Sequence, residues 1–367
     1  MALKINKCDI LIIGGGPAGL EAAYHAAKAA PGLKISIVEE NFLLGGQLIK
    51  QTHSFFGSKN QFAGKRGFEI AELLMDRVRK NPDIDIHLQT SALGCYEGGI
   101  VACESMAEGC LKEFQPGRTI VAAGARENMA PFPGNDLPGV FGAGAAQTLM
   151  NVYGVLPGRK VVMLGAGNIG LIVSYQLMQA GAEVLAIIEG LPMIGGYHVH
   201  AAKIRRMGVP ILASHTVVRA TGKSTLEEVE VAPIDKNWKI AGESTVFQAD
   251  TLCLAVGLTP GTELLEQSGC RMAFVKELGG HVAWHNDRME TSRPEILVAG
   301  DVSGIEEAST AMLEGKIAGL AAAEGLSGLD LSDEISRAQQ ELAGIRKGPY
   351  GEKACLGKDK LCKLSVR

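Results

Sequence analysis

The chain has 367 residues, of which 46 % are apolar and 21 % charged, so it can form two or three folded domains and is neither disordered nor a disulfide-stapled miniprotein. Its net charge of -4, without long runs of one sign, excludes an electrostatic basis for binding nucleic acid. No apolar run reaches the roughly 18 residues that a membrane-spanning helix needs, and the eight cysteines are scattered without a CxxC pair, so we expect a cytoplasmic protein without a transmembrane segment.

The first recognisable motif lies near the N-terminus. Residues 9–19 read DILIIGGGPAG, a β-branched apolar run that ends in GxGxxG, and an alanine-rich segment follows. A second apolar run, residues 35–40, ends in the acids Glu39 and Glu40. This order predicts a strand, a glycine-rich turn, a helix and a second strand, the pattern of a dinucleotide-binding unit.

The same landmarks recur about 150 residues later, which is the sign of an internal repeat. Residues 160–170 read KVVMLGAGNIG, and the apolar run that follows ends at Glu189. Two further landmarks repeat at offsets of 150 and 133 residues: LLGG (43–46) with MIGG (193–196), and TIVAAG ending at Gly124 with TLCLAVG ending at Gly257. The repetition predicts two copies of one fold.

Each glycine of the motif has a separate physical role. The first permits a sharp strand-to-helix turn, the second removes the Cβ that would block a diphosphate, and the third lets helix and strand pack closely. The diphosphate then lies at a helix N-terminus, where N–H groups and the helix dipole stabilise it. The three glycines are Gly14, Gly16 and Gly19 in the first copy and Gly165, Gly167 and Gly170 in the second.

The acids Glu39 and Glu189, at the ends of the second strands, are expected to accept hydrogen bonds from an adenosine ribose. Glu189 would repel a 2′-phosphate and no basic cluster follows it, so NAD is favoured over NADP at the second site. ATP or ADP would satisfy the same argument, because it covers adenosine recognition alone. His198 and His200 are spaced like a pair of metal ligands but have no third ligand nearby, so no metal site is expected.

Four motifs, in this order along the chain, resemble those of the flavoproteins with two dinucleotide-binding domains, to which thioredoxin reductase and the pyridine nucleotide-disulfide oxidoreductases belong. They are IIGGGPAGLEAA (12–23), TIVAAGA (119–125), VVMLGAGNIG (161–170) and ILVAGDVSG (296–304). The resemblance implies that the first motif binds FAD and the third binds NAD(P)H, of which Glu189 favours NAD(H). It also implies that Asp301 contacts the ribityl or diphosphate part of the flavin.

Several other residues are candidates for cofactor contacts. Gln47, Thr52 and His53 belong to a polar loop after the FAD-binding acid, and Arg126 would meet either a phosphate or an interdomain carboxylate. No general acid or base stands out, and hydride transfer between nicotinamide and flavin needs none, so the catalytic residues stay unassigned. The remaining candidates, expected from their motif positions, are Pro17, Ala18, Glu40, Gly46, Ala123, Gly124, Asn168, Ile169 and Gly300.

Cysteines are absent where the disulfide reductases of this superfamily carry them. No cysteine follows the first GG pair before Cys95, and the second copy has no CxxC, so dithiol chemistry is not expected. The segments 45–67, 125–151 and 301–326 resemble instead the α subunits of dye-linked L-proline dehydrogenase, opine oxidase and hydrogen cyanide synthase. This resemblance implies a second flavoprotein subunit as partner, and a small iron–sulfur protein as a further one.

We therefore expect an α/β chain with two Rossmann-like (GR2-type) dinucleotide-binding domains, the second inserted in the first. The expected division is an FAD-binding domain of residues 1–127 and 258–330, a nucleotide-binding domain of residues 128–257, and an extension of residues 331–367 with one amphipathic docking helix. Cys355 and Cys362 in this extension are too few for a [2Fe–2S] cluster, which takes four ligands.

The sequence thus predicts an FAD-dependent oxidoreductase subunit of a multi-subunit amino-acid or opine-type dehydrogenase. Such a subunit passes electrons between FAD, NAD(H) or another carrier and a partner subunit. Two alternatives stay open: a stand-alone NADH:acceptor flavin oxidoreductase, and an FAD subunit whose second site holds ATP or ADP without a redox role.

Overall fold

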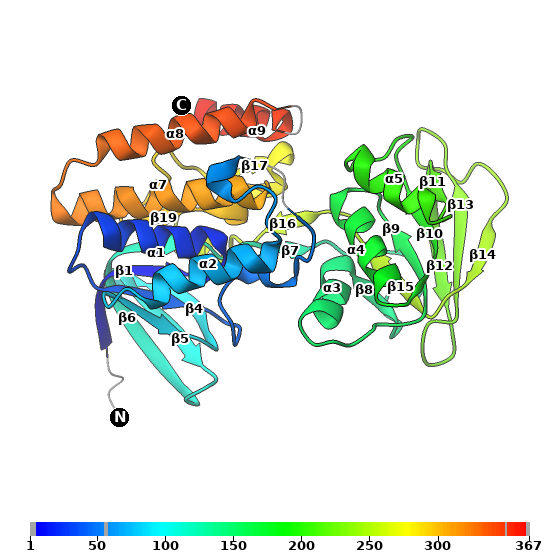
Figure 1. Cartoon of the computed structure of the whole chain (residues 1–367), viewed down its shortest axis with the longest axis horizontal. Helices are drawn as coiled ribbons and strands as arrows, with labels where there is room; N and C mark the ends of the chain where they lie inside the picture. Colours follow the sequence, from blue (N-terminus) through cyan, green and yellow to red (C-terminus); the bar gives the residue numbers. More distant parts are fainter. Residues whose placement is uncertain (1–4, 55–57, 349–350, 365–367) are drawn as a thin grey trace. The chain divides into compact units, whose positions relative to one another are not determined.

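The computed structural model describes residues 5–54, 58–348 and 351–364 and divides the chain into two compact units (Figure 1). The first unit contains Met1–Arg126 and Thr259–Arg367, and the second contains Glu127–Leu258. Both boundaries lie one residue from those expected. The tail after residue 330 belongs to the first unit and does not stand apart.

The first unit is built on a sheet that is parallel at its centre. Its strand order is β3 (Ile84–His87), β2 (Ile35–Val38), β1 (Ile5–Ile13), β6 (Cys110–Val121), β5 (Ile100–Ser105) and β4 (Thr90–Tyr96), and β19 (Ile296–Val298) also pairs with β6. The strands β4, β5 and β6 form an antiparallel meander, whereas the other pairs are parallel. Ile10, Leu11 and Ile12 of β1 are fully buried, as expected for a strand that is covered on both faces.

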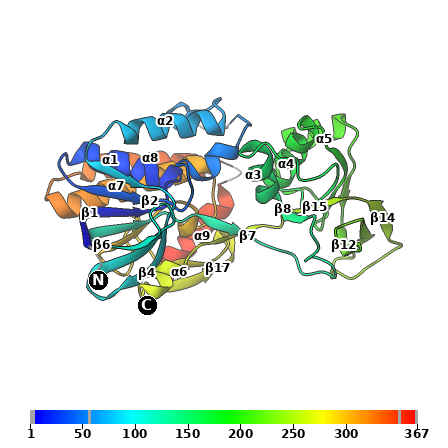
Figure 2. The ribbon, with the colours of Figure 1, turned by 90° about the horizontal axis from the view of Figure 1, so that it is seen from below.

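Three helices, α1 (Pro17–Ala29), α2 (Gly67–Arg79) and α7 (Ala308–Ser327), pack on one face of this sheet (Figure 2). α1 and α7 meet at backbone distance because α7 has glycines at the contact. A Cβ on Gly315 would stand 2.1 Å from the carbonyl oxygen of Ala18, and one on Gly319 would stand 2.2 Å from that of Ala22. α6 (Glu263–Gln267) and the hairpin of β17 (Met272–Val275) and β18 (Gly280–Ala283) contribute to the core on the other face.

The tail forms two helices, α8 (Ser332–Arg346) and α9 (Glu352–Lys363), where one docking helix was expected. α8 lies alongside α7 (Figure 1) and buries Ile335, Ala338 and Leu342, a stripe at helical spacing. α9 buries Leu361 against Leu278, which follows β17. Because both helices bury apolar side chains within the first unit, the tail is part of its core.

The second unit has a five-stranded parallel sheet. Its order is β11 (Ile211–Ala213), β10 (Glu183–Glu189), β9 (Lys160–Leu164), β15 (Thr251–Leu254) and β8 (Val140–Gly142). α3 (Ala143–Asn151), α4 (Asn168–Gln179) and α5 (His198–Arg206) pack on one face. The core on the other face of the sheet is contributed by three antiparallel strands, β12 (His215–Thr221), β13 (Glu228–Pro233) and β14 (Thr245–Gln248).

The parallel parts of the two sheets correspond strand for strand, β3-β2-β1-β6-β19 with β11-β10-β9-β15-β8. The fifth strand comes from opposite ends of the repeat, because β19 follows β6 in the chain whereas β8 precedes β9. The two chain crossings between the units, β7 (Ala125–Glu127) and β16 (Leu258–Pro260), pair with each other. Within the described residues, no helix combines the length and the apolarity needed to cross a bilayer.

Candidate functional site: two nucleotide cradles

The first glycine of each motif is required by the backbone. Gly14 has a φ of +104°, and a Cβ there would stand 2.4 Å from the carbonyl oxygen of Ala122. Gly165 has a φ of +111°, and its Cβ would stand 2.2 Å from the carbonyl oxygen of Ala255. A left-handed conformation and a neighbouring carbonyl group both exclude a side chain at these turns.

The third glycine of each motif is required by packing. A Cβ on Gly19 would stand 1.9 Å from the carbonyl oxygen of Gly14, and one on Gly170 would stand 2.0 Å from that of Gly165. The first turn of each helix therefore lies directly on the strand that precedes it, as the sequence predicted.

The second glycine is explained neither by the backbone nor by packing. Gly16 and Gly167 have φ of −75° and −74°, which any residue adopts. A Cβ on Gly16 would meet nothing closer than 3.8 Å, and one on Gly167 would meet no described atom within 4 Å. These residues are the N-caps of α1 and α4, and neither helix start has a side-chain cap. A diphosphate that binds the N–H groups of a helix start and occupies the space of a Cβ accounts for both glycines.

Glu39, the acid at the end of β2, lies beside the first cradle. Its Oε2 accepts a hydrogen bond from the N–H of Gly15 at 2.7 Å. Its Oε1 accepts from the N–H of Asn41 at 2.9 Å and from the Nδ2 of Asn41 at 2.7 Å. The carboxylate is therefore fixed in a buried position beside the glycine turn.

Glu189 has the same arrangement in the second cradle. Its Oε2 accepts from the N–H of Ala166 at 2.8 Å and its Oε1 from the N–H of Leu191 at 2.9 Å. Each oxygen makes one such bond and keeps a second acceptor site, which is the capacity that ribose hydroxyls need. The same two oxygens would repel a 2′-phosphate.

A second glycine pair folds back onto each cradle. Gly46 has a φ of +52°, and a Cβ there would stand 2.8 Å from the Cα of Gly16. A Cβ on Gly196 would stand 2.8 Å from the carbonyl carbon of Gly167. The GG segments therefore need glycine because the backbone passes close to the cradle.

The other predicted residues of the second cradle lie at the start of α4. Asn168 accepts a hydrogen bond from the N–H of Tyr197 at 2.8 Å through its Oδ1, and so holds the loop that follows β10. Ile169 is 41 % exposed.

The other predicted residues of the first cradle are spread over three segments. Pro17 is the first residue of α1, and Ala18 is buried in the core. Glu40, Gln47 and Ala123 are exposed, Thr52 and His53 are half-buried, and Gly124 has a φ of +72° with no neighbour that a Cβ would meet within 4 Å. Residues 55–57 of the polar loop lie outside the described residues.

Asp301 lies in the 3₁₀ turn Gly300–Ser303 that follows β19. This turn reaches the start of α1, because a Cβ on Gly300 would stand 2.9 Å from the Cβ of Ala18. The N–H of Glu306 donates to Oδ1 of Asp301 at 3.3 Å. Burial, with the nearby carboxylates of Glu314 and Glu306, raises the pKa of Asp301 to about 7.

Arg126 forms an exposed ion pair with Glu263 of the same unit. The sequence left open whether this guanidinium meets a phosphate or an interdomain carboxylate, and in the structure its partner is a carboxylate within the first unit.

The cysteines form no redox pair in the structure. All eight lie in the described residues, and no disulfide joins any two of them. Burial raises the pKa of Cys8 to about 11 and those of Cys103 and Cys253 to about 12, so these thiols are poorly ionised. A dithiol catalyst needs a low thiol pKa, so these side chains act as small core residues.

Sequence reasoning missed a buried polar cluster next to the Asp301 turn, formed by Glu314, Arg346 and Lys358. A lone acid within the apolar helix ASTAMLEGKIAGLAAA was the available signal for Glu314. Its partners could not be inferred, because nothing in the sequence brings the tail onto that helix.

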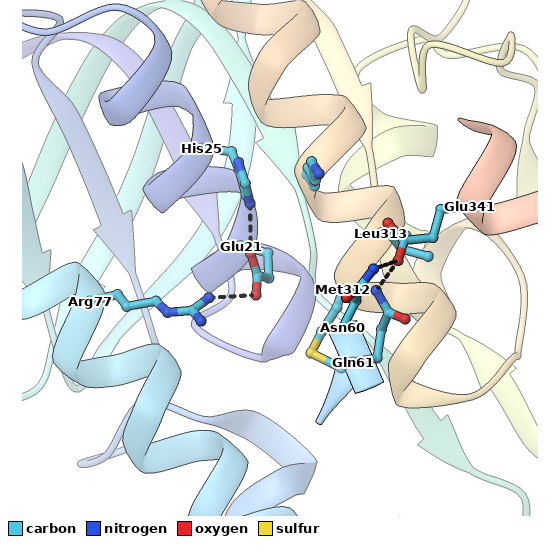
Figure 3. A pocket seen from close by; sticks show the side chains of 9 residues that line it. Glu21, His25, Asn60, Gln61, Arg77, Met312, Leu313 and Glu341 are labelled. Atoms are coloured by element: carbon cyan, nitrogen blue, oxygen red, sulfur yellow. Dashed lines mark hydrogen bonds and ion pairs between the residues drawn. The ribbon is translucent and has the colours of Figure 1, made fainter. Parts of the chain in front are cut away.

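A pocket of the first unit lies elsewhere, among α1, α2, α7 and α8 (Figure 3). On one side Nε2 of His25 lies 3.1 Å from Oε2 of Glu21, and Arg77 donates to Oε1 of Glu21 at 3.4 Å. On the other, Glu341 accepts from Asn60 at 2.7 Å and from Gln61 at 3.1 Å. The residues that line it include none of the predicted cofactor contacts, so the pocket is separate from the cradles.

Two glycine cradles on parallel sheets, each with an acid at the end of the next strand, define an α/β protein of the FAD/NAD(P)-binding oxidoreductase kind. The sequence matches the pyridine nucleotide-disulphide oxidoreductase family over residues 8–315, and the chain belongs to this family. Its members are flavin-dependent oxidoreductases that use FAD and NAD(P)H. The superfamily expected from the four motifs is thereby confirmed.

The relatives agree with the narrower resemblance. Hydrogen cyanide synthase subunit HcnB of Pseudomonas protegens is 30 % identical over 335 residues, covering 84 % of this chain and 69 % of that subunit. Sarcosine oxidase subunit alpha of Rhizobium meliloti is 28 % identical over 331 residues, which are 87 % of this chain but 30 % of that subunit. The solved L-proline dehydrogenase from P. horikoshii is 26 % identical, with a TM-score of 0.67, covering 92 % of this chain and 60 % of that one.

Proposed function

We propose that the chain is the FAD-containing, electron-transferring subunit of a hetero-oligomeric amino-acid or opine-type dehydrogenase. The first cradle would hold FAD through Gly16, Glu39 and the Asp301 turn. The second would hold NAD(H) through Gly167 and Glu189. FAD, when bound, supplies the redox chemistry, and the residues of the chain bind and orient the two nucleotides.

The observation that carries this proposal is the pair Gly16 and Gly167. Each is a glycine that neither its φ nor its neighbours require, and each stands at an uncapped helix start. Two such positions support two bound diphosphates. Free cysteines with raised pKa values argue against a dithiol relay between them.

Glu189 and Trp238 support an adenosine at the second cradle. A Cβ on Gly190, next to Glu189, would stand 2.6 Å from two ring atoms of Trp238, so the indole lies against this glycine. Trp238 is nonetheless 63 % exposed and adopts a φ of +61°, which is unusual for a bulky residue. The ring is thus held beside the ribose acid, and its fluorescence should report nucleotide binding there.

A partner subunit is supported by the relatives, which include a hydrogen cyanide synthase subunit and a sarcosine oxidase subunit. This chain spans less than a third of the latter. The catalytic site for the amine would then lie on the partner, in agreement with the absence of an assigned acid or base here.

The test is native mass spectrometry of the particle purified from its own host, combined with anaerobic NADH titration. Bound FAD, a co-purifying flavoprotein and NADH-dependent loss of flavin absorbance support the proposal. Rapid amine oxidation by the isolated chain would contradict it. NADH oxidation with oxygen or a quinone, without a partner, would favour the stand-alone oxidoreductase. Retained ATP or ADP without flavin reduction by NADH would make the second site a non-redox one.

A further inference from the structure

One carboxylate of α7 is buried deep within the first unit and has four donors. Glu314 is 2 % exposed. Its Oε2 accepts from the N–H of Gly300 at 2.9 Å and from Oγ of Ser303 at 2.7 Å. Its Oε1 accepts from Arg346 at 2.6 Å and from Nζ of Lys358 at 2.9 Å. One side of the carboxylate therefore binds the turn that carries Asp301, and the other binds cations from the tail.

Lys358 of α9 also binds the same turn directly. Its Nζ donates to the carbonyl oxygen of Ser303 at 3.1 Å and lies 2.8 Å from Oγ of that residue. It also lies 3.2 Å from Nε2 of His285. The Nδ1 of His285 lies 2.9 Å from the carbonyl oxygen of Ala283, which places the ring proton on Nδ1 and leaves Nε2 as an acceptor. Burial lowers the pKa of His285 to about 3, so the ring accepts as a neutral group.

Arg346 of α8 reaches the turn by a second route. Its Nε and a terminal nitrogen donate to the two oxygens of Glu306 at 2.9 Å and 2.5 Å, a bidentate pair. The N–H of Glu306 donates to Asp301. The guanidinium thus fixes the residue that binds the Asp301 carboxylate, in addition to Glu314.

The charges in this cluster balance. Two carboxylates, Glu306 and Glu314, face two cations, Arg346 and Lys358, and all four side chains are at most 12 % exposed. Burying four charges is costly unless each is paired and hydrogen-bonded, and removing one leaves its partner uncompensated. A tail that served only to cover apolar surface would not need these two cations.

We propose that Arg346 and Lys358 are positioning residues of the flavin site, which hold the Gly300–Ser303 turn through Glu314 and Glu306 and so present Asp301 to FAD. α8 and α9 therefore support the FAD site through these two residues, and not through their exposed faces. This inference rests on the proposed function in one respect, the assignment of the first cradle and Asp301 to FAD.

The test compares FAD affinity in Lys358→Met and Arg346→Met with that in matched controls on the same helices. Lys360 of α9 pairs with Glu277 and is half exposed, and Arg337 of α8 is exposed near Glu334. The controls Lys360→Met and Arg337→Met therefore remove the same kinds of charge at positions away from the turn. Apoprotein of the full chain is titrated with FAD, and ADP binding to the second unit is measured in the same samples. We expect the FAD Kd to rise at least tenfold in the two test variants and less than twofold in the controls, with ADP affinity unchanged in all four.

A purely structural role would give a different result. It predicts lower thermal stability in the folded test variants while their FAD Kd stays within twofold of wild type, and this would overturn the proposal. If a single substitution prevents folding, the double variant Glu314→Gln with Lys358→Met removes both charges of one pair and is expected to fold with the same loss of FAD affinity.

Hydrogen exchange on the wild-type chain tests the inference without any substitution. FAD addition should slow exchange in peptides from 340–346 and 352–364 as well as in the Asp301 turn, whereas unchanged exchange in both tail segments would overturn it. If the wild-type apoprotein binds no FAD at all, the proposed function fails instead, and the two failures are thereby distinguished.

Discussion

The two cradles share one backbone plan, but they differ in how much of the chain surrounds them. The GG loops approach both cradles alike, because Gly46 lies against Gly16 as Gly196 lies against Gly167. Around the first cradle the Asp301 turn also reaches the start of α1, and α7 meets that helix at backbone distance. In the second cradle Ile169, at the position of the buried Ala18, is 41 % exposed. The start of the helix is therefore more enclosed in the first unit than in the second.

This difference indicates that the residence time of a nucleotide is set by the surroundings of the motif. Enclosure by the Asp301 turn and α7 suits a cofactor that stays bound, because its release would require packed elements to move. The open cradle suits a nucleotide that exchanges during turnover. We therefore expect tightly held FAD in the first unit and weaker, reversible NAD(H) binding in the second.

The largest effects are expected from Gly19→Ala and Gly170→Ala. In each variant a Cβ would stand 2.0 Å or less from a carbonyl oxygen, so strand and helix must separate, at a cost of about 3 kcal/mol or more. Gly19→Ala should abolish FAD retention, whereas Gly170→Ala should leave the chain yellow. Denaturant unfolding checks this, because each unit holds one of the two tryptophans, Trp284 and Trp238.

The control for that comparison is Gly344→Ala on α8, where a Cβ would meet nothing within 4 Å. It should be neutral or slightly stabilising, since alanine favours a helix by about 1 kcal/mol over glycine. Loss of FAD in Gly170→Ala would show that the two units do not fold independently. The two cradles could then not be compared as separate sites.

Next in size are the effects of Gly16→Ala and Gly167→Ala. Neither added Cβ comes closer than 3.8 Å to a described atom, so the free energy of unfolding should change by less than about 1 kcal/mol. Ligand affinity should fall at least tenfold, for FAD in Gly16→Ala and for NADH in Gly167→Ala, with the other ligand unaffected. Isothermal titration of the apoprotein with each nucleotide measures both. Unchanged affinities would remove the diphosphate explanation of these glycines.

Asp301→Asn should lower the affinity for FAD and raise the stability of the apoprotein at high pH. The folded pKa of about 7 lies above the ordinary value of 3.8, so the contribution of Asp301 to stability is present below pH 3.8 and lost as the pH rises through 7. At pH 8 the ionised, buried carboxylate opposes folding of the apoprotein. Asparagine cannot ionise, so the variant should be more stable at pH 8 by about 1–4 kcal/mol, while its FAD affinity falls.

Guanidinium unfolding of the two apoproteins at pH 4.5 and pH 8 checks this sign. The stability difference between variant and wild type should be large at pH 8 and small at pH 4.5, where Asp301 is protonated in the folded state. An equal difference at both values would mean that this carboxyl is not held in a buried, ionisation-resistant position.

The smallest effect is expected from Arg126→Ala. Its ion pair with Glu263 has both side chains more than half exposed, and such pairs contribute about 0.2–1 kcal/mol. The FAD Kd should stay within twofold of wild type. A larger loss of affinity would show that this guanidinium leaves Glu263 to bind a phosphate when FAD is present.

Much of this protein could be predicted from local sequence. The spacing of Gly14, Gly16 and Gly19, with Glu39 at the end of the next strand, dictates a turn geometry that few backbones permit. The same residues recur at an offset of about 150, and the structure has matching hydrogen bonds to Glu39 and Glu189. Such motifs can be predicted from sequence because clashes with nearby backbone atoms require glycine at these positions.

The C-terminal tail could be predicted only in part from local sequence. For residues 331–367 the charged segment LDLSDEISRAQQELAG predicted one amphipathic docking helix. The structure has two helices, and each buries one cation of the tail. Arg346 and Lys358 are buried because Glu314 of α7 pairs with both of them.

Local sequence was enough to predict the two cradles, their acids and the lack of a CxxC pair, since each depends on residues close together in the chain. The packing of the helices was needed to show which cradle is more enclosed, and that Glu314, Arg346 and Lys358 meet beside the Asp301 turn. Contacts between residues 32 and 44 positions apart depend on how helices pack, and the polarity of a side chain does not reveal which distant charge will compensate it.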